Sequence, residues 1–149
     1  HLTYAGDPEI FRGEKLVYQN LRHETLPVRL VAAVDRDGFF PKNSLSYICR
    51  PKPPFSLEYL AGLLNSHLVN AWFAGRFFSF HITVTQVRSI PVPEADERRR
   101  GAVEQIVQRL ARIPPGDGIP EKDVMALSLA VAACYFPGQD PLQIVQQIA

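Results

Sequence analysis

The run 76–81, RFFSFH, holds the side chains whose types and spacing could bind a nucleic acid. An arginine and a histidine flank three phenylalanines and a serine. Cationic groups with interleaved aromatic rings can hold phosphates and stack on splayed bases. A simpler interpretation makes the phenylalanines core residues and lets the basic side chains reach water. We expect the phenylalanines to lie in the core, whereas both interpretations stay open for Arg76.

Lys42 and Asn43 form a second candidate, in a loop between two expected strands. Asparagine can read the edge of adenine, and lysine can hold guanine or a phosphate. The ordinary polarity of a loop would also explain both residues. The charge distribution favours an anionic partner, because residues 38–93 hold 5 basic and 1 acidic side chains. This excess is too small to establish nucleic-acid binding by itself.

Catalytic and metal-binding patterns are absent from the sequence. It has no glycine-rich phosphate loop, no catalytic spacing of serine, cysteine or histidine, and no metal-ligand spacing. Asp35 and Asp37 flank an arginine, and we interpret them as turn residues, because acid–base catalysis would need a cleft. Cys49 and Cys134 lie in apolar contexts and are expected to be buried free thiols, which suits a reducing cytoplasm.

Targeting signals are also absent. The sequence has no signal peptide and no apolar run long enough to span a bilayer. We therefore predict a cytoplasmic location and no membrane partner. His1 is not a natural start, so we expect the chain to have been cut from a longer protein.

The elements that must position these residues can be read from hydrophobic periodicity. Residues 14–21, 28–35 and 44–50 read as strands, and their short connections favour antiparallel pairing. Residues 57–73 read as one helix that is apolar on most sides and therefore belongs in the core. Residues 82–90 could form a strand or a single helical turn, and both readings stay open.

A different region begins after the segment Pro91-Val92-Pro93. Residues 95–112 form an amphipathic helix with a narrow apolar stripe, followed by helices over 122–136 and 141–147. The predicted fold class is α+β: a small, mainly antiparallel sheet packed on a central helix and followed by a helical tail. The predicted domains are residues 1–93 and 94–149.

The order of these motifs resembles a known family. A strand begins with EKLV at 14–17, a hydrophobic strand ends in Val34-Asp35, and another strand follows a turn. A helix then carries LLNSHL at 63–68, and IPVP closes the region at 90–93. Residues 13–93 resemble the TaqI-like C-terminal specificity domain. Such target-recognition domains follow the catalytic domain in adenine-specific DNA methyltransferases and type II restriction-modification enzymes.

The resemblance implies recognition of double-stranded DNA, with loops in the major groove and basic residues on the backbone. It also implies a parent enzyme, with an upstream methyltransferase domain, that transfers a methyl group from S-adenosylmethionine to adenine N6. The cofactor-binding glycine motif and the Asn/Asp-Pro-Pro-Tyr/Phe motif are absent, so we expect this chain to be no enzyme and to hold no cofactor. The residues expected to contact DNA are Arg22, Lys42, Asn43, Arg50, Lys52, Arg76, His81 and Arg88.

Two residues of the family motif receive a structural role instead. Asn65 and Ser66 lie on the central helix, and we expect their side chains to fix that helix to a neighbouring loop by hydrogen bonds. We therefore do not assign them to base contacts.

Two other functions stay open. The helix 95–112 and the C-terminal helices could assemble with another protein or with a second copy of the chain, as the acidic balance after Pro93 suggests. DNA binding should weaken steeply with salt, whereas an apolar interface should not. An unrecognised hydrolase would need a cleft that holds a perturbed acid–base pair.

Overall fold

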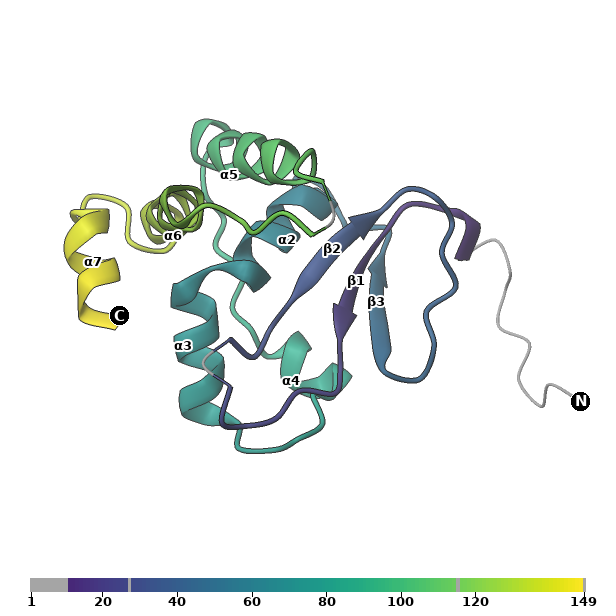
Figure 1. Ribbon diagram of the computed structural model, residues 1–149. Coiled ribbons are helices and arrows are strands. Elements are labelled where there is room, and N and C mark those ends of the chain that lie inside the picture. Colours follow the sequence, from purple (N-terminus) through teal and green to yellow (C-terminus); the bar gives the residue numbers. More distant parts are fainter. Residues whose placement is uncertain (1–10, 27, 115, 149) are drawn as a thin grey trace, which may run out of the picture.

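The computed structural model describes residues 11–26, 28–114 and 116–148. Its sheet contains β1 (Lys15–Gln19), β2 (Ala32–Asp35) and β3 (Leu45–Cys49) in the order β2-β1-β3 (Figure 1). β1 pairs antiparallel with both neighbours, so that Leu16 lies opposite Val34 and Ile48. The small antiparallel sheet predicted from the sequence is confirmed.

The second strand is shorter than the predicted range 28–35, which was wrong at its start. β2 begins only at Ala32, because the preceding backbone makes its hydrogen bonds elsewhere. The N–H groups of Arg29 and Leu30 both donate to Oδ1 of Asn70, each over 2.7 Å. A side chain of the central helical segment thus takes the place of a neighbouring strand.

The predicted single helix over 57–73 is two helices, α2 (Leu57–Asn65) and α3 (His67–Arg76). Ser66 separates them with an extended backbone (φ −77°, ψ 150°). Its hydroxyl donates to the Leu63 carbonyl and accepts from the Val69 N–H, so it caps both helices. A serine hydroxyl can compete in this way with the hydrogen bonds of the helical backbone. The apolar residues continue at helical spacing across Ser66, so their pattern did not reveal the break.

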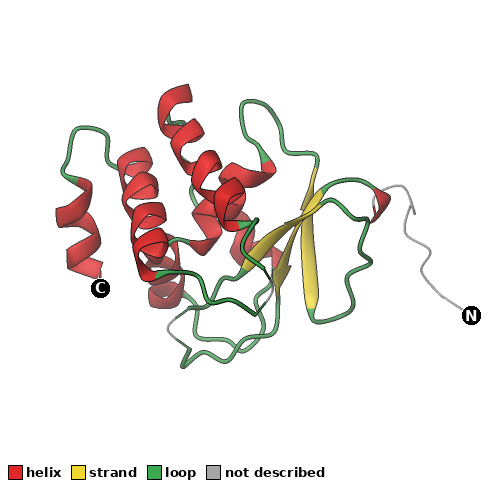
Figure 2. Ribbon diagram, turned by 45° about the horizontal axis from the view of Figure 1, so that its top comes forward, coloured by secondary structure: helices red, strands yellow, loops and turns green. Residues whose placement is uncertain are grey.

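Further helices among the described residues are α4 (Val84–Arg88), α5 (Glu97–Leu110), α6 (Glu121–Tyr135) and α7 (Pro141–Ile148) (Figure 2). α4 settles the open choice for residues 82–90 in favour of a helical turn. Thr83 and Gln86 form a capping box that begins it. The predicted helices over 95–112, 122–136 and 141–147 are confirmed with small shifts at their ends.

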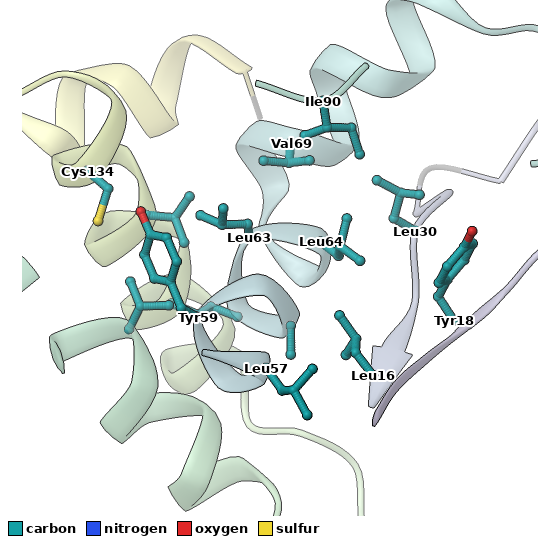
Figure 3. Close-up of a cluster of buried hydrophobic side chains, with 14 of the residues drawn as sticks. Leu16, Tyr18, Leu30, Leu57, Tyr59, Leu63, Leu64, Val69, Ile90 and Cys134 are labelled. Atoms are coloured by element: carbon teal, nitrogen blue, oxygen red, sulfur yellow. The ribbon is translucent and has the colours of Figure 1, made fainter. Parts of the chain in front are cut away.

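The sheet packs on one side of α2, and α5 and α6 pack on its other side (Figure 1). Side chains of α2 point in both directions (Figure 3): Leu57 and Leu64 face the sheet, while Tyr59 and Leu63 face α6. The buried side chains on both sides belong to one continuous cluster. This architecture confirms the α+β class, while the division into domains at residue 93 stays a prediction.

α2 and α5 approach each other closely at Gly62. A Cβ atom at this position would overlap the side chain of Val103 and crowd Val107. These valines belong to the narrow apolar stripe of α5, which is thus covered within the chain. The close approach of α2 and α5 therefore depends on a residue with no side chain.

Candidate nucleic-acid interface

The 77–83 loop joins α3 to α4 and runs beside the connection between β1 and β2 (Figure 1). Backbone hydrogen bonds hold the two segments together. The Arg22 N–H donates to the Phe80 carbonyl over 3.2 Å, and the Ile82 N–H donates to the Asn20 carbonyl over 2.8 Å. A β-bridge between Leu21 and His81 lies between these bonds. The loop is therefore fixed to the sheet through main-chain atoms.

Arg29 fixes the start of the same loop from inside the protein. This side chain is buried, and its guanidinium donates to the carbonyls of Phe77 (3.0 Å) and Ser79 (2.5 Å). The guanidinium also lies 5.9 Å from the ring centre of Phe73. Sequence reasoning missed this residue. The signal for it was a single arginine inside an apolar run, which must find buried acceptors.

The expectation that the phenylalanines of this run lie in the core is wrong for two of the three. Phe77 packs against Phe73 with ring centres 4.8 Å apart and is half-buried. Phe78 is 80% exposed and Phe80 is 47% exposed. The backbone becomes extended at Phe77, where α3 ends, so only the first ring reaches the core. Exposed rings beside cations are the arrangement that stacks on bases.

Three basic candidates lie around this loop. Arg76 is exposed at the end of α3, with its guanidinium 5.1 Å from the ring centre of Trp72. His81 is exposed, and its ring packs edge-on against Phe80. Arg22 is half-buried and donates to the Val28 carbonyl (3.0 Å) and to Gln19 Oε1 (2.6 Å).

Arg88 lies at the same end of the sheet, as its effect on Tyr18 shows. Burial raises the pKa of Tyr18, while a hydrogen bond with Ser46 and the positive charge of Arg88 partly oppose this rise. The Arg88 side chain is itself exposed, so its charge is available to a partner.

Lys42 and Asn43 are exposed and directly precede β3. The next residue, Ser44, accepts a backbone hydrogen bond from Asn20 over 3.0 Å. Since Asn20 also binds the 77–83 loop, these contacts bring Lys42 and Asn43 to the end of the sheet that carries this loop. We name this end the reading end. It is made of Arg22, Lys42, Asn43, Arg76, Phe78, Phe80, His81 and Arg88.

Arg50 and Lys52 lie elsewhere. Both are exposed, but they follow the far end of β3. A strand of five residues separates its two ends by about 16 Å. The structure therefore does not bring these two candidates together with the other six.

The aspartates around the first turn are structural, as predicted. Asp35 accepts hydrogen bonds from the N–H groups of Asp37 (3.0 Å) and Phe39 (2.8 Å), and it pairs with the buried Lys15. Within residues 11–26, 28–114 and 116–148, no group of three or more histidine, cysteine or acidic side chains could hold a metal ion. None of the helices in these ranges is both long and apolar enough to cross a membrane.

Asn65 and Ser66 have structural roles, as predicted, but their partners are strand β2 and the two helices themselves rather than a loop. The Asn65 amide accepts from the Ala32 N–H (3.0 Å) and donates to the Ala32 carbonyl (2.8 Å), so it extends the pairing of the edge strand β2. Ser66 caps two helices. The equivalent role of the buried Asn70 was missed, because its partners lie about forty residues away in sequence.

Comparisons with known proteins agree with the motif order. No curated protein and no solved structure matches the chain. The family described as the TaqI-like C-terminal specificity domain matches residues 1–92, which include the sheet, α2, α3, α4 and most of the reading end's supporting backbone. More than half of the sequence is covered by this match. The chain therefore belongs to the family of TaqI-like C-terminal specificity domains, which are specificity domains of restriction-modification enzymes.

Proposed function

We propose that this chain recognises a target sequence in double-stranded DNA for a restriction-modification enzyme that methylates adenine N6. The observation that carries the proposal is the reading end, where six of the eight candidate residues gather around a loop fixed by main-chain bonds. Family membership supports the same function, since a specificity domain directs an enzyme to its target.

The proposed parent enzyme supplies the chemistry. An upstream methyltransferase domain would bind S-adenosylmethionine and transfer its methyl group in the cytoplasm, where the DNA lies. This chain would hold no cofactor and would act by binding the target DNA so that the methyltransferase domain can reach its adenine.

The side chains of the reading end suggest a division of roles. Arg76, Arg88 and Lys42 are exposed cations suited to phosphate oxygens. Asn43 and His81 carry donors and acceptors suited to base edges. No acidic residue occurs between positions 76 and 93, so nothing in this segment repels a phosphate backbone. We assign Arg50 and Lys52 no part in this contact.

A salt series tests this function. Affinity of the chain for a random-sequence duplex is measured by fluorescence anisotropy at several salt concentrations. We expect the logarithm of the affinity to fall linearly with the logarithm of the salt concentration. Arg76→Ala and Arg88→Ala should each make the slope shallower by about 0.9, the value of one lost phosphate contact.

Lys52→Ala is the matched control, because it removes an exposed cation at the opposite end of the sheet. Its slope should equal that of the unaltered chain. Absence of binding at low salt, or equal slopes for all four proteins, would overturn the assignment of the reading end to DNA.

The packing of α5 disfavours assembly through its apolar stripe. Val103 is fully buried, and Ile106, Val107 and Leu110 pack against the core of the same chain. A stripe that α2 and α6 already cover offers no apolar face to a second protein. We therefore favour DNA over a protein partner as the ligand of this chain.

A further inference from the structure

Phe78 is the most exposed large apolar side chain among the described residues, at 80% of its surface. Leaving a ring of this size in water forgoes the free energy that its burial would contribute to stability. Its neighbours Phe77 and Ile82 take half-buried and buried positions in the same loop. The loop thus places Phe78 further into solvent than any of its other apolar groups, including the partly exposed Phe80.

The backbone on both sides of this ring is fixed. Arg29 holds the carbonyls of Phe77 and Ser79, which are the residues directly before and after Phe78. Ser79 is held again through its hydroxyl, which donates to the His81 carbonyl over 2.7 Å and accepts from Gln86 over 3.1 Å. A ring presented on a fixed backbone loses little conformational entropy when it meets a ligand.

The surroundings of the ring indicate the chemistry of that ligand. Arg76 lies two residues before it, His81 three residues after it, and both are exposed. An exposed aromatic ring between an arginine and a histidine suits a polyanion that also offers flat apolar faces, which describes a nucleic acid.

We propose that Phe78 is a wedge that enters the base stack of the bound DNA and stacks on a base there. The inference rests on the proposed DNA-binding function and assigns a role within it. Apolar side chains that enter a base step unstack it, which bends or opens the duplex at that point. The cations of the reading end would hold the backbone while the ring occupies the gap between bases.

The wedge predicts a preference for DNA in which a gap already exists. Two duplexes of identical sequence are compared, one fully matched and one with a single abasic site, and their affinities are measured by anisotropy. The unaltered chain should bind the abasic duplex about fivefold to a hundredfold more tightly, the range that one base–aromatic stack supplies. Phe78→Ala should bind the abasic and the matched duplex with equal affinity, whereas Phe78→Trp should keep the preference for the abasic duplex.

Phe39→Ala is the matched control, because Phe39 is also exposed (55%) but lies beside the Asp35 turn at the other end of the sheet. It should leave the ratio unchanged. The salt slope of Phe78→Ala should equal that of the unaltered chain, since no charge is lost. Thermal unfolding should also be unchanged, because the removed ring is exposed.

The outcomes separate the wedge from the DNA-binding function itself. Salt-dependent binding with equal affinity for both duplexes, or a ratio that survives Phe78→Ala, would overturn the wedge and leave DNA recognition standing. Absence of binding to either duplex at low salt would overturn both.

Discussion

Polar side chains in this protein satisfy main-chain groups that regular secondary structure would otherwise satisfy. Asn65 pairs with both backbone groups of Ala32, Asn70 binds the backbone of residues 29 and 30, and Arg29 binds two carbonyls of the 77–83 loop. A structural role for Asn65 could be predicted from its position on the central helix. Those of Asn70 and Arg29 could not, because a local pattern does not show a partner 40 to 50 residues away.

The solvent exposure of single side chains was the property that the sequence predicted least well. A run of three phenylalanines has the composition of a core segment, and burial is the usual fate of such rings. Whether each ring faces inward depends on where α3 ends and on how the loop leaves it. The path of the loop depends in part on hydrogen bonds from Arg29, a residue outside the run.

The ion pair between Lys15 and Asp35 should make stability depend on pH. Burial by itself raises the pKa of Asp35, but hydrogen bonds from Lys15 and from the N–H groups of Asp37 and Phe39 bring this pKa below its usual range. A lowered pKa in the folded state adds stability above the unfolded value of about 3.9, and this stability is lost as the pH falls through the folded pKa. The free energy of unfolding should therefore decrease below about pH 4.

Urea unfolding at pH 7 and pH 3 measures this effect. Asp35→Asn should be destabilised by about 3 to 5 kcal/mol at pH 7, because Lys15 stays buried without its partner. Its free energy of unfolding should change less between the two pH values than that of the unaltered chain. Asp37→Asn, at an exposed position in the same turn, serves as the control and should keep the full decrease. An unchanged pH dependence in Asp35→Asn would contradict the assignment.

At the scale of elements, the periodicity of apolar residues predicts most of the helices and strands. It fails where a polar side chain redirects the backbone. Ser66 interrupts the central helix, although the apolar residues continue at helical spacing on both sides of it. Asn70 binds the backbone before β2, although the sequence of residues 28–35 is typical of a strand throughout. Element type could therefore be predicted from the sequence, and the break and the shortened strand could not.

A substitution at Gly62 tests the close approach of helices α2 and α5. Gly62→Ala should lower the free energy of unfolding by about 1 to 3 kcal/mol, because the added methyl group overlaps Val103 and pushes α5 away from α2. Gly101→Ala is the matched control, since its helix position has nothing within 4 Å. That change should instead raise stability by about 0.5 to 1 kcal/mol. Urea unfolding measures both, and a neutral Gly62→Ala would contradict the close approach.

At the scale of the whole molecule, one cluster of buried residues extends from the sheet to the tail. Leu16 and Leu30 on the sheet side connect through α2 to Val131 and Cys134 of α6 (Figure 3). Sequence reasoning placed a boundary at residue 93 from a change in composition and from the prolines there. A change in composition along the chain does not show which segments pack together. The apolar residues on most faces of the central helix did indicate that it must be covered on both sides.

We therefore expect the chain to unfold in a single transition. Circular dichroism follows mainly the helices, and fluorescence of Trp72, the one tryptophan of the sequence, follows α3. The two signals should change at the same temperature if the core is one cooperative unit. Removal of residues 94–149 should abolish that transition, because it exposes the Tyr59 and Leu63 face of α2. Two separate transitions would contradict a shared core.

The main-chain bonds of the 77–83 loop have a consequence for how this domain can diverge. Arg29, Arg22 and Asn20 bind main-chain groups of residues 77, 79, 80 and 82. A change of the side chain at Phe78 or His81 would remove none of these bonds. The outward side chains can therefore mutate without altering the shape that presents them. Selection for a new target site could exchange these residues one at a time, while the fold and its stability pass unchanged from ancestor to descendant.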